Sequence, residues 1–451
     1  MLARASERRS EDLGAPPATR EVTSIFTFQR GPLRGDVRVA GDKSISHRAL
    51  MLAAAAHGTS RVAAPNLGAD VLATRDAVIA LGARVVLRDG GFDVTGGPLH
   101  SPAATIDARN SGTTTRLLMG LCAGRGLTAT FDGDASLRRR PMERVARPLR
   151  ALGAEVTTAP GGRLPATVRG ITAPPGGEFA LEIASAQVKS AILLANLEAT
   201  GTVRITGDRF SRDHTERLLR RFGRTIRFDG MSVELEPGTL AAQDVRVPAD
   251  LSGAAFFLAG AAVTPGSDLV VREVGVNPTR TGVLDALRAM GADLTVFDER
   301  DLDGEPVADV RVRYRPLAGV TLDGELVVRA IDEVTILAVV AAHADGITRI
   351  RDAADLRGKE SDRLATIAET LRTCGVTVAE QPDGLDITGG GARVPGVPLR
   401  TYEDHRIAMA VAALAAPTGP HAIDDAGCIA VSFPDFTPMW SAAQAAGSPA
   451  G

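Results

Sequence analysis

The chain has 451 residues, of which 44% are hydrophobic, and its formal net charge at pH 7 is −3. This length exceeds what one hydrophobic core usually supports, so two or three domains are expected. Aromatic residues make up 4% of the chain, and the longest basic run is the arginine triplet at 138–140. A nucleic-acid partner is not expected, because such a surface needs a basic stripe and usually stacking rings.

Disulfides, membrane spans and targeting signals are not indicated either. Cys122, Cys374 and Cys428 lie far apart and outside any CxxC or Cys/His pattern, which points to a reducing compartment and a cytoplasmic protein. The apolar runs are shorter than the about 18 residues that a membrane span requires. Residues 1–21 mix arginine with acidic residues and lack an apolar segment, so a disordered extension is predicted there.

Six stretches of the chain share one pattern: a polar cluster, an alanine-rich apolar helix, a short β run and a second amphipathic helix. The polar clusters begin near Gly41, Arg109, Ala184, Ala249, Ile331 and Tyr402. In five stretches the second helix ends at a glycine, as a helix C-cap requires, before residues typical of a return strand. We therefore expect β-α-β-α-β-like units, three over 42–244 and three over 245–446.

The polar clusters stand where they would cap the first helix of each unit. Ser, Asn, Asp and Gln at these positions leave the positive end of the helix dipole available to an anion. Several such helix ends facing one cleft would form an anion receptor. For the cluster at 249–257, which has no cation, simple capping is the favoured interpretation.

Lysine is rare in this chain. Lys43, Lys189 and Lys359 are its only lysines among 51 lysine and arginine residues, and each lies in a polar cluster. Where arginine fills nearly every other cationic role, a retained lysine indicates a site that needs a compact ammonium group. The alternative is an arginine-rich coding bias that left three lysines by chance.

Two clusters of the first half combine cations with small or hydroxyl side chains. GDKSISHR places Lys43, Ser44 and Arg48 within about one and a half helical turns, so an amine, a hydroxyl and a guanidinium can meet one doubly charged group. RNSGTTTR contains Gly112, whose missing side chain lets a ligand approach the backbone.

The rest of the first half adds Arg140, fixed before a proline, and the neutral hydrogen-bond partners Ser185 and Gln187 in SAQVKS. In the second half, IDEV presents Asp332 ahead of a purely apolar helix, an unusual place for a solvated carboxylate. These residue types again suit the binding of an anion beside a proton-transfer group.

RGKESDRL places Lys359, Glu360 and Arg363 close together, although a surface salt-bridge ladder would look the same. YEDHRIAM adds His405 and Arg406. The acidic neighbours of this histidine could indicate a metal site, but no second histidine is nearby, so an anion site is favoured and no metal is expected.

Eight motifs together closely resemble the EPSP synthase family, the 3-phosphoshikimate 1-carboxyvinyltransferases. They are, in order, GDKSISHRAL, NSGTTTRLL, GDASLRRRPM, SAQVKSA, SRDHTERLL, NPTRTG, KESDRL and EDHRIAM. The likeness runs from about Gly41 to Pro434. It implies the enolpyruvyl transferase fold, a two-domain inside-out α/β barrel with three β-α-β-α-β-β units per domain, in which 22–41 joins 245–446.

The resemblance implies transfer of the carboxyvinyl group of phosphoenolpyruvate to the 5-hydroxyl of shikimate 3-phosphate in aromatic amino acid biosynthesis. The hydroxyl would add to C2 while C3 is protonated, giving a tetrahedral ketal phosphate that then eliminates phosphate. No cofactor, metal, nucleic-acid or membrane partner is implied, and a monomer is expected.

The resemblance also assigns residues to the two substrates. Shikimate 3-phosphate would contact Lys43, Ser44, Arg48, Ser185, Ala186, Gln187, Arg212, Asp332 and Lys359. Phosphoenolpyruvate would contact Lys43, Gly112, Arg140, Arg363 and Arg406, with His405 beside them. Asp332 would take the hydroxyl proton, and Glu360 or Lys43 would act as the acid that protonates C3. The arginines would offset the repulsion between two multiply charged substrates and keep Asp332 ionised.

The chain departs from common family patterns at two positions. Ala186 stands where many members have a second serine, and Val431 where many have a lysine near phosphoenolpyruvate. These variations resemble the glyphosate-tolerant members, whereas Gly112 is the small residue associated with sensitivity. We expect Gly112 to prevail, so that glyphosate competes with phosphoenolpyruvate.

Three other functions fit less well. The related transferase acting on UDP-N-acetylglucosamine normally carries a reactive cysteine in one loop. The corresponding loop of this chain reads GDASLRRRP and contains no cysteine. A non-catalytic anion-binding scaffold would be expected to lack the acid and base groups, but Lys43, Asp332 and Glu360 are present. An RNA end-processing enzyme would need a nucleotide site, and no Walker pattern occurs.

Overall fold

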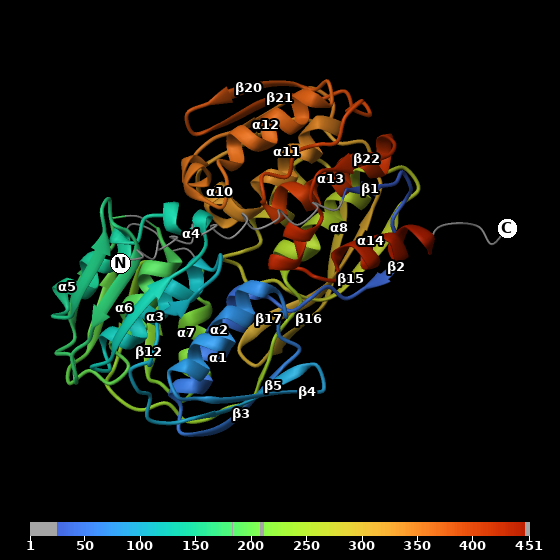
Figure 1. The fold of residues 1–451 in the computed structure, drawn as a ribbon. Helices are drawn as coiled ribbons and strands as arrows, with labels where there is room; N and C mark the ends of the chain where they lie inside the picture. The colour runs from blue at the N-terminus through green and yellow to red at the C-terminus, as the bar shows by residue number, and fades with distance from the viewer. Residues whose placement is uncertain (1–24, 183, 208–211, 447–451) are drawn as a thin grey trace, which may run out of the picture.

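The computed structural model describes residues 25–182, 184–207 and 212–446. In these residues the strands form five four-stranded sheets and one two-stranded sheet. Figure 1 shows them in two lobes around buried helices, with the lobes meeting at the centre of the molecule. The extension predicted at 1–21 lies outside the described residues.

The first half contains three repeated units. Their elements are α1 (Lys43–Ala55), β3 (Gly58–Ala63), α2 (Ala69–Ala80), β4 (Arg84–Arg88), β5 (Gly91–Gly96), β6 (Ile106–Asp107), α3 (Gly112–Ala123), β7 (Thr128–Asp132), α4 (Ala135–Arg139), α5 (Glu143–Ala151), β8 (Glu155–Ala159), β9 (Arg163–Arg169), β10 (Gly177–Ala180), α6 (Ala186–Ala195), β11 (Val203–Thr206), α7 (His214–Arg221), β12 (Ile226–Phe228), β13 (Ser232–Leu235) and β14 (Val245–Arg246).

The second half is completed by two strands from the start of the chain. Its elements are β1 (Phe26–Phe28), β2 (Arg34–Val37), α8 (Leu251–Val263), β15 (Asp268–Gly275), α9 (Gly282–Ala289), β16 (Asp293–Leu302), β17 (Glu305–Arg313), β18 (Thr321–Leu322), α10 (Gly324–Arg329), the 3-10 helix η1 (Ile331–Glu333), α11 (Val334–His343), β19 (Ile347–Ile350), η2 (Ala354–Gly358), α12 (Arg363–Thr373), β20 (Thr377–Gln381), β21 (Gly384–Thr388), α13 (His405–Thr418), β22 (His421–Ile423), η3 (Gly427–Val431) and α14 (Phe436–Ala445).

The five four-stranded sheets share one topology, which confirms the repeat predicted from the sequence. Each has one parallel pair at one edge and two antiparallel pairs, as in the order β6-β7-β9-β8. The sixth unit differs, because β22 pairs only with β1 and makes a single bridge from Ile423 to Leu399. After β22 the chain continues into η3 and α14, so this unit has no second helix followed by two return strands.

Two strands join sheets that the chain order alone does not predict. β2 runs parallel to β15 in the second half, and β14 runs parallel to β3 in the first. The two crossings between halves lie side by side, where Asp42 N donates to Pro248 O at 2.8 Å and Asp250 N donates to Ala40 O at 2.9 Å. One hydrophobic core spans Ile45 to Val247 and the other combines 28–39 with 249–443.

The first helix of each unit is buried along most of its length. Side chains of Asp42, Ser111, Ser185, Asp250 and Asp404 cap the N-termini of α1, α3, α6, α8 and α13, as the polar clusters predicted. Helices α3 and α6 pack closely because Gly124 has no side chain: a Cβ there would lie 1.6 Å from Ala195 O. In the part of the chain described, no helix is both long and apolar enough to cross a bilayer.

Candidate active site

A cavity of about 540 Å³ lies between the two halves, where the N-terminal ends of the capped helices converge. It brings together nearly every residue proposed from the sequence. From the first half it is lined by Lys43, Ser44, Gly112, Arg140, Ser185, Ala186, Gln187 and Arg212. From the second half it is lined by Asp332, Lys359, Glu360, Arg363, His405 and Arg406.

Two cations proposed from the sequence do not line this cavity. Lys189 is 1% exposed and pairs with Glu216 at 2.5 Å, so the prediction from lysine rarity fails for this residue. Arg48 is 4% exposed, and its guanidinium donates to Thr215 Oγ1 at 2.7 Å, Ser190 Oγ at 2.9 Å and the backbone oxygen of Ser44 at 2.9 Å. Arg48 therefore supports the cavity wall from behind.

Asp332 lies at the 3-10 turn before α11 and faces cations from both halves. Its carboxylate pairs with Arg212 of the first half and lies 3.6 Å from Lys359 Nζ and 3.7 Å from Arg363 Nη1. Its backbone oxygen accepts a hydrogen bond from Arg406 at 2.6 Å. Burial raises the pKa of Asp332, but these cations outweigh burial and hold the pKa well below its usual range. Asp332 is therefore ionised at neutral pH.

Glu360 is the second carboxylate of the cavity. It lies 2.6 Å from Arg363 Nη2 and 3.4 Å from Arg140 Nη1 across the cleft. Burial raises its pKa, but Arg363 and Arg140 outweigh this and hold the pKa well below the usual value. Arg363 is itself 2% exposed and donates from Nε to the buried Asp404 at 2.8 Å.

His405 occupies the first residue of α13, beside these groups. Burial, together with the charge of Lys43, lowers the pKa of His405 to about 3. Its imidazole is therefore neutral at physiological pH and is a poor proton donor. In the described residues, no group of three or more His, Cys, Asp or Glu side chains could hold a metal ion.

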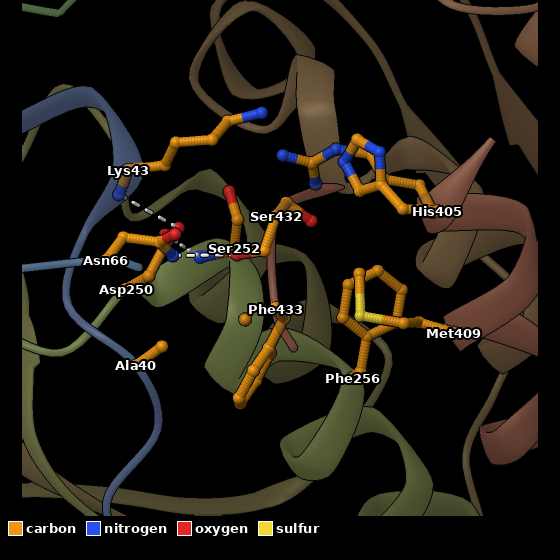
Figure 2. A pocket seen from close by; sticks show the side chains of 12 residues that line it. Ala40, Lys43, Asn66, Asp250, Ser252, Phe256, His405, Met409, Ser432 and Phe433 are labelled. Atoms are coloured by element: carbon orange, nitrogen blue, oxygen red, sulfur yellow. Dashed lines mark hydrogen bonds between the residues drawn. The ribbon is translucent and has the colours of Figure 1, made fainter. Parts of the chain in front are cut away.

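A smaller pocket of about 20 Å³ adjoins the cavity. Figure 2 shows Lys43 and Asp250 on one side of it, and His405, Met409 and Phe256 on the other. Burial and the neighbouring Asp42 raise the pKa of Asp250 to about 6. Val431 lines neither the smaller pocket nor the main cavity.

Comparison with known proteins decides between the functions that this cleft could serve. The family model for EPSP synthase (3-phosphoshikimate 1-carboxyvinyltransferase) matches residues 28–440. The chain belongs to this family. It is 50% identical over 413 residues to the 3-phosphoshikimate 1-carboxyvinyltransferase of Gloeobacter violaceus, covering 90% of this chain and 95% of the relative. The corresponding protein of Alkalilimnicola ehrlichii is 49% identical over 419 residues, or 91% and 93% of the two chains.

Solved structures agree with this assignment. An EPSP synthase from Acinetobacter baumannii superposes with a TM-score of 0.80 at 40% identity, covering 93% of this chain and 98% of that one. The enolpyruvyl transferase NikO from Streptomyces tendae shares the fold, with a TM-score of 0.75 at 19% identity over 93% of this chain and 96% of that one. The predicted fold class, enzyme class and family are thus confirmed, and the chain has EPSP synthase activity in the shikimate pathway.

Two further residues of the site were missed in the sequence. Asp70, in the first turn of α2, forms an ion pair with Lys43 Nζ at 2.9 Å and lines the cavity. Arg116, in α3, donates from Nη1 to Gln187 Oε1 at 2.8 Å. Asp70 looked like an ordinary acidic residue in a first helical turn, whereas Arg116 stood in a motif already singled out for Gly112.

Proposed function

We propose that the cavity binds phosphoenolpyruvate and shikimate 3-phosphate together and that Asp332 accepts the proton of the attacking 5-hydroxyl. The observation that carries this proposal is the placement of Asp332 among cations of both halves. These cations keep it ionised in a buried cleft, and the anionic substrates would offset them and raise the pKa of Asp332, so that it can accept a proton. The hydroxyl then adds to C2 of phosphoenolpyruvate to give the tetrahedral ketal phosphate.

The two substrates would occupy neighbouring parts of this cationic cleft. Shikimate 3-phosphate suits the side with Lys43, Ser44, Ser185, Ala186, Gln187, Arg212 and Lys359, which mixes cations with neutral hydrogen-bond partners. Phosphoenolpyruvate suits the side with Gly112, Arg140, Arg363, His405 and Arg406. Guanidinium groups are well matched to carboxylates and phosphates because they can donate two parallel hydrogen bonds.

We propose that Glu360 gains its proton when the substrates bind. In the protein alone, Arg363 and Arg140 keep Glu360 ionised, and His405 is neutral. Anionic substrates would offset these cations and raise the pKa of Glu360, so that it can protonate C3 during addition and take a proton back during elimination. Lys43, held by Asp70, is the alternative donor.

Proton uptake on binding tests this role. At a pH between the pKa of Glu360 in the free protein and its pKa in the complex, substrate binding should take up on the order of one proton. This uptake should fall to zero as the pH rises through the pKa of Glu360 in the complex. Titration calorimetry in buffers of different ionisation enthalpy measures it. Glu360→Gln should remove this component while leaving proton changes from the ligand phosphates. Equal buffer dependence for both proteins would contradict the proposal.

Gly112 offers a second prediction at the phosphoenolpyruvate side. A Cβ at this position would lie 2.7 Å from Arg116 Nη1, so the Arg116 guanidinium would have to shift, and 3.4 Å from Arg140 Nη1, which is an ordinary contact. We expect Gly112→Ala to raise the KM for phosphoenolpyruvate about tenfold, because the methyl group fills space beside both guanidiniums and displaces one of them, and a loss of about 1.4 kcal/mol of binding free energy is tenfold.

We also propose that glyphosate competes with phosphoenolpyruvate. Gly112→Ala should raise the inhibition constant of glyphosate by a larger factor than it raises the KM for phosphoenolpyruvate. Steady-state inhibition of both proteins measures this effect. A wild-type inhibition constant far above the KM for phosphoenolpyruvate would contradict it.

We further propose that the chain is a monomeric cytoplasmic enzyme whose halves, 42–244 and 22–41 with 245–446, are domains that close over the ligands. The pairing of β14 with β3 favours placing the second boundary nearer residue 248. Contacts that cross the cleft support closure, including Arg144 Nη1 to Asp355 at 3.1 Å and Ser136 Oγ to the backbone oxygen of Glu360 at 3.2 Å. Light scattering after gel filtration would reveal any larger assembly.

A paired assay tests the proposed substrates. Phosphate release should be rapid with phosphoenolpyruvate and shikimate 3-phosphate together, and should stay at background when UDP-N-acetylglucosamine replaces the second substrate. Release with the sugar nucleotide would contradict the proposed substrate pair.

A further inference from the structure

The hairpin of β16 and β17 belongs to the second half, yet its tip contacts the first half. Its turn at 303–304 meets α7 and β14 of the first half: Arg217 Nη1 donates to Gly304 O at 2.9 Å, Arg221 Nη2 pairs with Asp303 at 3.1 Å, and the backbone N–H of Arg246 donates to Asp303 at 2.8 Å. Figure 1 shows this hairpin extending from the sheet of β15 toward the lobe that contains α7. The hairpin thus connects the two halves, in addition to the two places where the chain crosses between them.

A buried polar network lies behind this tip and joins the motifs NPTRTG and SRDHTE. Glu305 Oε1 contacts His214 Nδ1 at 2.7 Å, and Asn277 Nδ2 donates to Asp213 at 2.6 Å and to Glu305 at 3.0 Å. Asn277, His214 and Glu305 are 1%, 2% and 3% exposed. Buried polar groups are stable only when they are paired, so losing one partner exposes the others to the full desolvation penalty.

This network fixes the end of α7 that faces the active site. Asp213 and His214 directly follow Arg212, whose guanidinium lies in the cavity against Asp332 and within 3.5 Å of Ser44 Oγ. Thr215, in the next position, accepts the hydrogen bond from Arg48, which in turn donates to the backbone oxygen of Ser44. A shift of α7 would therefore move Arg212 directly and Ser44 through Arg48.

We propose that Glu305 and Asn277 are positioning residues for the acceptor substrate: from the second half, they hold the start of α7 so that Arg212 and Ser44 stand in place for the acceptor phosphate. This inference rests on the proposed placement of shikimate 3-phosphate beside Arg212. Neither Glu305 nor Asn277 lines the cavity, so both act through α7 rather than on a substrate.

Kinetics of four variants test the inference. Glu305→Ala and Asn277→Ala should raise the KM for shikimate 3-phosphate about tenfold, because small displacements of binding groups are costly, while the KM for phosphoenolpyruvate changes less than about twofold. Glu299→Ala removes an exposed carboxylate of the same hairpin, for which the described part of the chain offers no partner, and should change neither constant. Glu305→Gln can pair with both His214 and Asn277 and should restore most of the loss.

A structural measurement separates positioning from loss of stability. Hydrogen exchange should be faster in α7 of Glu305→Ala than in the wild type, with α12 of the second half unchanged. Should Glu305→Ala not fold, Asn277→Ala leaves the contact between Glu305 and His214 in place and supplies the same comparison. Unchanged KM for shikimate 3-phosphate in folded Glu305→Ala or Asn277→Ala overturns the inference.

A further pair of variants shows whether a negative result concerns the positioning role or the proposed placement of shikimate 3-phosphate. Arg212→Ala and Ser44→Ala alter the proposed phosphate contacts directly and should raise the KM for shikimate 3-phosphate. If they do not, the substrate placement is wrong. If they do, while Glu305→Ala and Asn277→Ala do not, only the positioning role is wrong.

Discussion

Replacing Asp332 with asparagine should lower kcat by about 10²- to 10⁴-fold, the usual contribution of a positioned general base. The asparagine side chain keeps the shape and can still hydrogen-bond the 5-hydroxyl, but it cannot accept its proton at neutral pH. The KM for shikimate 3-phosphate should therefore change much less than kcat. Initial rates of phosphate release with both substrates saturating measure the effect.

Asp355 provides the matched control for this substitution. It is a second aspartate at the cavity, paired with Lys359 at 3.2 Å and with Arg144 across the cleft at 3.1 Å, but half of its side chain is exposed at the rim. Asp355→Asn should keep kcat within about tenfold of the wild type, since a solvated ion pair contributes little. A kcat for Asp332→Asn above a tenth of the wild-type value would contradict the assignment of Asp332 as the base.

Arg363→Ala should have the second large effect, on both stability and activity. Arg363 is buried among the carboxylates of Asp404, Glu360 and Asp332. It forms ion pairs with Asp404 at 2.8 Å and with Glu360 at 2.6 Å. Removing it leaves Asp404, which is 0% exposed, without its cation. Breaking a buried ion pair in this way typically costs about 3–5 kcal/mol of folding free energy. The KM for phosphoenolpyruvate should rise as well, because a proposed contact is lost.

Arg357→Ala serves as the control for Arg363→Ala. Arg357 lies nearby in η2 and pairs with Asp362 and Glu380, each at 2.9 Å, but it is partly exposed. Arg357 also donates to the backbone oxygens of Pro382 at 2.8 Å and Gln381 at 2.7 Å, so its loss should cost about 1–2 kcal/mol, still less than the loss of Arg363. Urea unfolding of both variants measures the difference. Equal free energies of unfolding for the two variants would show that the buried cluster does not stabilise the fold.

The repeat and most of the site were predictable because they depend on local chemistry. Capping residues, alanine-rich helices and closing glycines recur within each unit, so they can be seen without knowing how units pack. The polar clusters converge because each opens a helix, and helix ends facing one cleft bring their caps together. Eight motifs in one order then indicated the family before any geometry was known.

Features that depend on packing between units were not predictable. β14 has only two residues, and nothing in its sequence shows that it pairs with β3 rather than with a strand of the second half. Arg48 and Lys189 stand in polar clusters, but partners on α6 and α7 draw both behind the cavity wall. NPTRTG was recognised only as a family motif; its meeting with His214 and Asp213 is visible only in three dimensions.

A crystal structure of the protein with shikimate 3-phosphate bound would test the role of Asp332 and the placement of this substrate most directly. We expect the 5-hydroxyl to lie within about 3 Å of an Asp332 carboxylate oxygen, as proton transfer requires. We expect the 3-phosphate to lie beside Ser44, Ser185 and Arg212. A 5-hydroxyl that faces no carboxylate, or a phosphate bound instead by Arg140 and Arg406, would contradict the proposed division of the cleft and the role of Asp332.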